Sequence, residues 1–335
     1  MMRPMTLGEI AAAVGCTDSY FLDNNAKITS ISTDSRPQPE DGDRESCLFV
    51  ALRGEVFDGH AYVGAALRNK AQYALVDKKG VEEYCKELPA QQLIVCEDTE
   101  QGFLDLAGAY RDRYHFRMVG VTGSVGKTTT KEMIAQVLSA QFETLKTQGN
   151  FNNRVGLPKT LLELDETVQA AVIEMGMNHF GEISDLTRRA KPDAAVITNI
   201  GVAHIEYLGS REGILKAKME ITEGLAPGSP LILNGDDDML ASVKPANHIE
   251  PVFFGLNPDL AYYADEIENL GLKGTAARFH TPDSEFRAHI SIPGAHMVYN
   301  ALAAIAVGRV MGMNDEEIRQ GIESLAPLAG RNHLI

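Results

Sequence analysis

Residues 120–130 have the sequence Gly-Val-Thr-Gly-Ser-Val-Gly-Lys-Thr-Thr-Thr, and this stretch decides the fold. Before it lies a short apolar run, 116–121, that is typical of a strand, and after it apolar residues recur at helical spacing from 131 to 140. A strand, a glycine-rich turn and a helix in this order are the context that a phosphate-binding loop requires. We therefore predict a nucleotide site at this turn.

The residue types of this turn suit the binding of phosphates. Its glycines let backbone N–H groups approach anionic oxygens, and the helix N-terminus adds positive partial charge. Lys127 can reach the outer phosphates, and Thr128 can place its hydroxyl on a magnesium ion. Val121 stands where the usual spacing has glycine, so the alternative is a glycine–serine turn that happens to carry a lysine. The predicted nucleotide-binding positions are Gly123, Ser124, Gly126, Lys127, Thr128 and Thr129.

Composition limits the class of protein. At 335 residues the chain should contain about two domains, and its net charge of −15 argues against a broad nucleic-acid-binding surface. No apolar run approaches the roughly 20 residues needed to cross a bilayer, and the N-terminus lacks the apolar core of a signal peptide. The four cysteines show no metal-binding spacing. We therefore expect a cytoplasmic protein with reduced cysteines that does not insert into a membrane.

The order of predicted strands and helices divides the chain into two α/β domains. Residues 1–112 alternate short strands and helices in a small N-terminal α/β domain. Over residues 113–327, apolar strands alternate with helices, a pattern that predicts a mostly parallel sheet with helices on both faces, as in P-loop ATPases. Past Phe254 the pattern changes to alternating segments that suggest an antiparallel extension.

Ligands of such sheets bind at the carboxyl ends of the strands, so polar residues there are candidates. Glu174 closes an apolar strand and is a candidate magnesium ligand, the alternative being a carboxylate that faces solvent. His204 follows the strand 194–198, where a ligand role and an ordinary loop histidine both stay open. Lys218 lies on a predicted helix, 212–225, where an isolated lysine is normally a solvated charge.

Two polar segments have more than one interpretation. The segment 149–158 contains three asparagines, whose amides can bind sugar or phosphate oxygens but can also cap a helix. The segments 33–36 and 54–60 are polar loops next to predicted strands. On spacing alone, turn formation explains these two loops better than ligand binding does.

Taken together, several segments resemble the Mur ligase family of peptidoglycan synthesis over nearly the whole chain. In that family the variant first position of the phosphate loop is usual. Around the asparagine loop the chain is most similar to members that join D-alanyl-D-alanine to UDP-N-acetylmuramoyl-tripeptide. Sister ligases that add another amino acid share the catalytic core and stay the nearest alternative. The segments that carry the resemblance are 122–128, 149–153 with 156–158, 174–177 with 181–183, 198–201 with 203–204, and 208–212 with 216–218.

The resemblance implies a catalytic centre that uses ATP and two Mg²⁺ ions. Lys127 would contact the ATP phosphates, while Thr128 and Glu174 would hold one ion. His204 would help to hold the second ion. Lys218 stands where the family carries a carbamylated lysine, whose carboxylate-like group would neighbour that second ion. The implied catalytic residues are therefore Lys127, His204 and Lys218.

The resemblance also implies the substrate contacts. Asn300 would face the adenine, and Arg331 would belong to the nucleotide site as well. Ser35 and Arg36 would receive the UDP end of the muramoyl substrate.

In the implied reaction, a peptide is extended at the expense of ATP. Asn150 and Asn153 would line the path of the muramoyl-peptide. Its terminal carboxylate would attack the γ-phosphate of ATP to form an acyl phosphate, and the amine of D-alanyl-D-alanine would then displace phosphate. Two divalent cations and a lysine would offset the repulsion between a carboxylate and a triphosphate.

Family members carry a third domain that binds the amine and closes over ATP. Residues 328–335 would be only the start of that domain, so we expect a monomeric fragment that binds the UDP-substrate but ligates poorly or not at all. A UDP-sugar-binding module without turnover therefore stays an alternative. A phosphotransferase or nucleotide switch is a third, which the combination of Glu174 with Lys218 disfavours.

Overall fold

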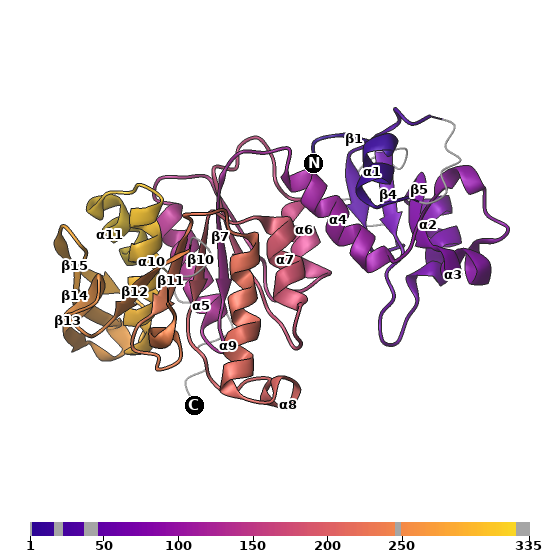
Figure 1. Cartoon of the computed structure of the whole chain (residues 1–335). Helices are drawn as coiled ribbons and strands as arrows, with labels where there is room; N and C mark the ends of the chain where they lie inside the picture. The colour runs from indigo at the N-terminus through magenta and orange to yellow at the C-terminus, as the bar shows by residue number, and fades with distance from the viewer. Residues whose placement is uncertain (1, 17–22, 37–45, 245–248, 326–335) are drawn as a thin grey trace. The chain divides into compact units, whose positions relative to one another are not determined.

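The computed structural model describes residues 2–16, 23–36, 46–244 and 249–325, which form two compact α/β units (Figure 1). The first unit contains residues 1–114 together with 154–166, and the second contains 115–153 and 167–335. Residues 154–166, which the sequence-based boundary leaves in the central domain, therefore pack with the N-terminal unit. The predicted α/β fold class is confirmed.

The first unit is built on a parallel four-stranded sheet in the order β3-β4-β5-β6, beside an antiparallel pair of β1 with β2. Every residue of β4 is buried, as expected for a parallel strand that is covered on both faces. The elements of this unit are β1 (Met5–Thr6), α1 (Leu7–Ala13), β2 (Lys27–Ile28), β3 (Ser30–Ser32), β4 (Cys47–Val50), η2 (Gly59–Tyr62), α2 (Val63–Asn69), β5 (Tyr73–Asp77), α3 (Lys78–Gly80), η3 (Val81–Cys85), η4 (Ala90–Gln92), β6 (Leu93–Cys96), α4 (Thr99–Arg111) and α6 (Gly156–Leu161).

The second unit contains a nine-stranded sheet in the order β15-β14-β13-β12-β11-β10-β7-β9-β8. Neighbouring strands from β8 to β13 are parallel, and β13, β14 and β15 pair antiparallel, so the predicted antiparallel extension is present. The strands are β7 (Arg117–Thr122), β8 (Thr144–Lys146), β9 (Ala170–Glu174), β10 (Ala194–Ile197), β11 (Pro230–Asn234), β12 (Glu250–Gly255), β13 (Tyr262–Asn269), β14 (Thr275–His280) and β15 (Glu285–Ile290).

Helices cover both faces of this sheet (Figure 1). On one face α5, α10 and α11 pack against one another and share one apolar core with the strands. On the other face lie α7 and η5, and Ile221 of η5 approaches Gly120 of β7. The helices are α5 (Lys127–Leu138), α7 (Glu182–Ala190), α8 (Ile205–Leu208), α9 (Arg211–Met219), α10 (His296–Val310) and α11 (Asp315–Glu323), with the short turns η5 (Glu220–Gly224), η6 (Leu240–Ser242) and η7 (Gly271–Lys273).

The candidate residues lie at the carboxyl ends of three central strands of the sheet, β7, β9 and β10. The chain runs from β7 outward to β8 on one side and later returns to the other side of β7 as β10. The connections that follow β7 and β10 therefore leave in opposite directions, which opens a crevice at the carboxyl ends of these strands. The predicted phosphate loop follows β7, Glu174 ends β9, and His204 follows β10.

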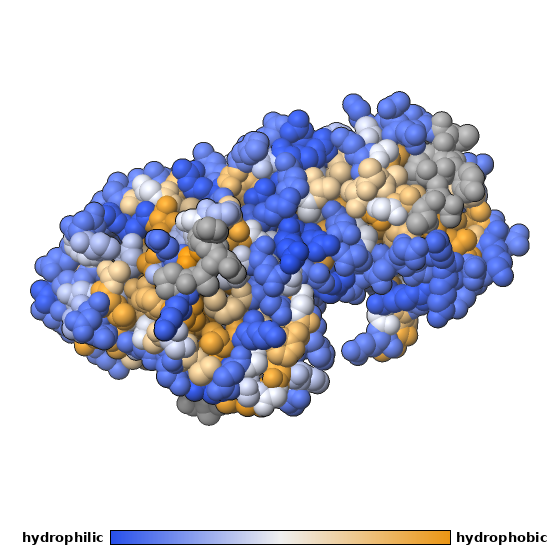
Figure 2. Space-filling view, viewed as in Figure 1, coloured by the Kyte–Doolittle hydropathy of each residue, from blue (hydrophilic) through white to orange (hydrophobic). Residues whose placement is uncertain are grey.

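The surface is mainly hydrophilic in the view of Figure 2, with scattered hydrophobic areas. Over the described part of the chain, no helix combines the length and the apolar composition that a membrane span requires.

Candidate functional site

The loop between β7 and α5 has the conformation that its glycines predict. Gly126 caps α5 with φ +79°, and Gly123 has φ +152°. A Cβ on Gly123 would lie 1.9 Å from Thr198 Oγ1, so only glycine fits at this point. The Thr198 hydroxyl donates to Val125 O (2.7 Å), and Ser124 N donates to Asn199 O (3.0 Å). The segment after β10 therefore holds the loop in place through hydrogen bonds.

The amine of Lys127 lies over this loop. Its Nζ donates to the carbonyl of Gly123 (2.8 Å), so the side chain folds back across the turn. Burial lowers the pKa of Lys127, and the negative charge of Glu174 partly opposes that shift. The predicted lysine and carboxylate are thus close enough to interact electrostatically.

Glu174 is a buried carboxylate with one partner. It pairs in register with Val121, directly before the phosphate loop, and is 2% exposed. Its Oε1 accepts from Asn152 Nδ2 (2.8 Å), whereas its Oε2 has no hydrogen-bond partner within the described ranges. A buried carboxylate oxygen without a donor is costly, and a cation would remove that cost. The alternative of a solvent-facing carboxylate is wrong.

The arrangement fits Mg²⁺ shared between protein and phosphate. No group of three or more histidine, cysteine, aspartate or glutamate side chains that could hold a metal occurs in the described part of the chain. Mg²⁺ is usually bound by one or two carboxylates together with substrate phosphates and water. Glu174 and Thr128 can supply the protein oxygens of such a site, because Thr128 directly follows the loop and Glu174 ends the strand that pairs with β7.

Lys218 is a buried lysine on α9 and is not solvated. It is 2% exposed, and burial together with repulsion from Lys127 lowers the pKa of Lys218 to about 7. The alternative of a solvated helical charge is therefore wrong for this residue. Lys127, the first residue after the phosphate loop, is thus close enough to affect the pKa of Lys218, which the position of Lys218 in the sequence does not reveal.

His204 also follows the carboxyl end of a strand, β10, but it makes fewer contacts with the other candidate residues. It is half-buried and caps α8 in a left-handed conformation, with φ +66°. The hydrogen bonds and ion pairs of the described residues include none between His204 and either Lys127 or Glu174. Its role as a metal ligand stays a prediction.

A cavity of about 420 Å³ opens beside the phosphate loop. Its size is within the range of small-molecule sites. Thr129 and Asn300 line it, as do Phe254, His296 and Tyr299, three residues that the sequence did not single out. The amide of Asn300 accepts from Thr130 Oγ1 (2.9 Å) and donates to Met297 Sδ (3.4 Å), so its orientation is fixed.

The N-terminal unit contains two adjoining cavities, of about 820 and 670 Å³. Ser35 and Arg36, the predicted UDP contacts, line the larger one, and the Arg36 guanidinium pairs with the Asp34 carboxylate (2.6 Å). Lys159 of α6 lines both cavities, together with Thr33 and Asp34. Sequence reasoning missed Lys159, because α6 lies far from residues 33–36 along the chain.

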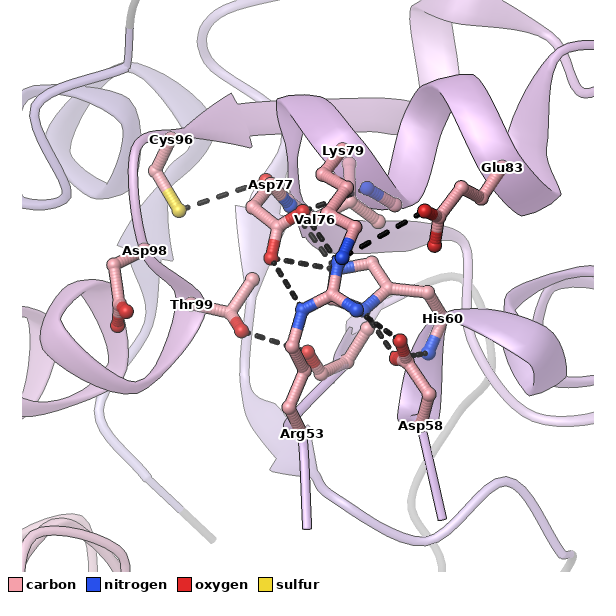
Figure 3. Close-up of polar contacts among 12 residues, drawn as sticks. Arg53, Asp58, His60, Val76, Asp77, Lys79, Glu83, Cys96, Asp98 and Thr99 are labelled. Carbon is pink, nitrogen blue, oxygen red and sulfur yellow. Dashed lines mark hydrogen bonds and ion pairs between the residues drawn. The ribbon is translucent and has the colours of Figure 1, made fainter. Parts of the chain in front are cut away.

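Four polar side chains hold the loop that borders the larger cavity (Figure 3). Arg53 donates to both carboxylate oxygens of Asp77 (3.1 and 2.9 Å) and pairs with Asp58. The buried His60 donates from Nδ1 to Asp58 (2.6 Å) and accepts at Nε2 from the backbone N–H of Asp77 (3.1 Å). These contacts fix the base of the loop that follows β4.

The tip of the same loop is hydrophobic and exposed. Val56 and Phe57 are 80% and 69% exposed, and Figure 2 shows hydrophobic surface at this tip. Phe57 also lines the larger cavity.

The remaining predicted residues fall into two groups. Asn150 and Asn153 are exposed, and it is Asn152, which lies between them, that contacts Glu174. Arg331 and the segment 328–335 lie outside the described residues.

Comparison with known proteins identifies the family. The profile of the Mur ligase middle domain matches residues 121–308. The UDP-N-acetylmuramoyl-tripeptide–D-alanyl-D-alanine ligase of Bacillus subtilis is 39% identical over 335 residues, which cover all of this chain and 70% of the relative. The Escherichia coli ligase of the same name is 35% identical over 305 residues, covering 91% of this chain and 65% of that protein.

Solved structures agree with these relatives. A crystal structure of MurF from Acinetobacter baumannii superposes with a TM-score of 0.87 at 33% identity, covering 98% of this chain and 70% of that one. The MurF ligase from Thermotoga maritima in complex with ADP gives a TM-score of 0.79 at 30% identity, covering 90% of this chain and 67% of that one. This chain thus spans about two thirds of the length of these proteins. The chain belongs to the Mur ligase family and is of the MurF type.

Proposed function

We propose that this chain binds ATP with Mg²⁺ and UDP-N-acetylmuramoyl-tripeptide, and that it activates the peptide carboxylate for coupling to D-alanyl-D-alanine. The observation that carries the proposal is the buried Glu174 oxygen without a hydrogen-bond partner, one strand away from a phosphate loop. The names of the relatives supply the two substrates, and the ADP complex of a relative supports the nucleotide.

The reacting groups repel each other, since a carboxylate must approach a triphosphate. Lys127 and the N-terminus of α5 provide fixed positive charge where the phosphates would lie. Thr128 and Glu174 would hold a magnesium ion, which when bound neutralises charge on the phosphate oxygens. The terminal carboxylate oxygen then forms a bond to the γ-phosphorus, and ADP leaves. The D-alanyl-D-alanine amine adds to the resulting acyl phosphate, loses a proton and expels phosphate.

Lys218 is suited to carbamylation. Because burial lowers its pKa to about 7, a large share of the amine is unprotonated at neutral pH. An unprotonated amine can attack the carbon of CO₂, forming an N–C bond and releasing a proton. The product carries a negative charge close to Lys127, which relieves the repulsion between the two lysines.

The UDP end is assigned to the N-terminal unit. Ser35, Arg36 and Lys159 bring a hydroxyl and two cationic side chains to the cavity of about 820 Å³, which is also lined by Asp34, the carboxylate that pairs with Arg36. A diphosphate has the complementary charge, and the adjoining cavity of about 670 Å³ leaves space for further parts of the substrate.

The test is to trap the acyl phosphate with hydroxylamine. We expect this chain, given ATP, Mg²⁺ and UDP-N-acetylmuramoyl-tripeptide, to form an acyl hydroxamate that depends on the muramoyl substrate. Lys127→Ala should reduce its rate by at least about 100-fold, the scale of losing one transition-state donor.

Two results would contradict parts of the proposal. Binding of both ligands without any hydroxamate would leave a non-catalytic UDP-sugar and ATP-binding module. A product formed with another amino acid, and not with D-alanyl-D-alanine, would point to a sister ligase.

A further inference from the structure

The carboxylate of Glu174 is held on one side only. Its Oε1 accepts a hydrogen bond from the amide of Asn152, and its Oε2 is buried without a partner in the described part of the chain. We propose that Asn152 is a positioning residue of the metal site, which fixes Glu174 so that Oε2 faces the cation. This inference rests on the proposed function, because it assumes that Glu174 is a metal ligand.

Asn152 contacts the end of β9 twice. Its Nδ2 donates to Glu174 Oε1 (2.8 Å), and its backbone carbonyl accepts from Gly176 N (2.8 Å). A Cβ on Gly176 would lie 3.0 Å from Asn152 Cγ, so the asparagine packs directly against this glycine. Side chain and backbone together give the amide one orientation relative to the carboxylate.

The backbone of Glu174 is fixed independently of Asn152. Glu174 N donates to Thr147 Oγ1 (3.0 Å), and the Thr147 carbonyl accepts from Lys131 Nζ (2.6 Å). Lys131 is fully buried, and its amine also pairs with Glu132 (2.9 Å). Lys131 lies one turn after Lys127 on α5, so the phosphate-binding helix also supports the strand end that carries the carboxylate.

The one-sided contact favours a functional role over a structural one. A carboxylate that only stabilises a fold gains most when both oxygens accept hydrogen bonds. Here the Asn152 amide binds Oε1 of Glu174, and this hydrogen bond keeps the carboxylate group from rotating. The other oxygen stays available to a cation, and hydrogen-bonding partners of this kind tune metal affinity.

The experiment measures Mn²⁺ binding to the complex of the chain with ADP, by electron paramagnetic resonance of the free ion. We expect Asn152→Ala to weaken Mn²⁺ binding by about 10- to 100-fold, the effect typical of a residue that orients a ligand. Asn152→Leu, which keeps the volume of the side chain but not its amide, should weaken it equally. Gln148→Ala removes an exposed amide from the same loop and should leave Mn²⁺ affinity unchanged.

A double-mutant cycle with Glu174→Gln shows whether Asn152 acts by orienting the Glu174 carboxylate or whether its replacement disturbs the structure in general. If Asn152 acts through the carboxylate, Asn152→Ala should cause little further loss of Mn²⁺ affinity in the Glu174→Gln background. ADP binding without metal should be the same in all variants. Equal losses in both backgrounds, or unchanged Mn²⁺ affinity in Asn152→Ala and Asn152→Leu, would overturn the inference. If Glu174→Gln itself leaves Mn²⁺ affinity unchanged, the proposed metal role of Glu174 fails instead.

Discussion

At the scale of single residues, three lysines of the central unit, Lys127, Lys131 and Lys218, have largely buried amines but differ in the groups that surround them. Lys131 is fully buried, and Glu132 and a backbone carbonyl pair with it. Burial lowers the pKa of both Lys127 and Lys218; Glu174 partly opposes the shift of Lys127, whereas repulsion from Lys127 adds to the shift of Lys218. A chemical role is expected where a buried charge lacks compensation, and a structural one where it is paired.

The lowered pKa of Lys218 predicts how stability depends on pH. In the folded chain this pKa is about 7, whereas in an unfolded chain it is about 10.4. Between these values the unfolded state binds more protons, so the contribution of Lys218 to the free energy of unfolding should rise with pH. Below pH 7 both states are protonated and the contribution should be constant.

Urea unfolding in CO₂-free buffer at pH 6, 7.5 and 9 checks this prediction. The free energy of unfolding should rise with pH in the wild-type chain relative to Lys218→Met, which cannot titrate. A difference that shrinks between pH 7.5 and 9 would contradict a lowered pKa.

Side-chain direction is also where the sequence was least informative. Asn150, Asn152 and Asn153 lie within four positions, and no periodicity tells which amide a loop turns inward. The two exposed residues, Asn150 and Asn153, were assigned to the path of the muramoyl-peptide, a role that stays a prediction. Asn152, which contacts Glu174, was not singled out. Lys218 was a similar case, because its burial depends on contacts between elements that are distant in sequence.

At the scale of elements, the strand, loop and helix of residues 117–138 were predictable because their signals are local. Glycine spacing fixes the turn, and apolar spacing fixes the strand and the helix around it. The place of α6 was not predictable in this way. The segment 154–166, which contains α6, joins the first unit through contacts such as the hydrogen bond from Tyr110 Oη to Leu164 O (2.8 Å), over 54 residues of chain.

The packing of α11 against α5 depends on Gly321. A Cβ at this position would lie 2.4 Å from Val137 Cα, a backbone atom that cannot move alone. Gly321→Ala should therefore lower the free energy of unfolding by about 1–3 kcal/mol, as overpacked cores do.

Gly64 of α2 is the matched control, since the nearest atom to its Cβ would be 3.5 Å away. Gly64→Ala should stabilise the chain by up to about 1 kcal/mol through helix propensity. Denaturant unfolding measures both variants, and an unchanged midpoint for Gly321→Ala would refute the close approach of the two helices.

At the scale of the whole molecule, two anion sites are assigned to a chain whose net charge is −15. Each site must therefore supply its own cations. Arg36 and Lys159 do so for the proposed UDP site, where Asp34 offsets one of the two charges, and Lys127 with the N-terminus of α5 does so for the nucleotide. The residues of each proposed site lie within one compact unit, so UDP and the nucleotide should bind to different units.

This division predicts that each ligand stabilises its own unit. A ligand present at 100 times its dissociation constant adds about 2.7 kcal/mol to the unit that binds it. In differential scanning calorimetry, UDP should raise the unfolding temperature of one transition and ADP with Mg²⁺ that of another. Arg36→Ala should remove only the UDP effect, and Lys127→Ala only the ADP effect. If either substitution removed both effects, the sites would not be independent, and the assignment of UDP to the N-terminal unit would be wrong.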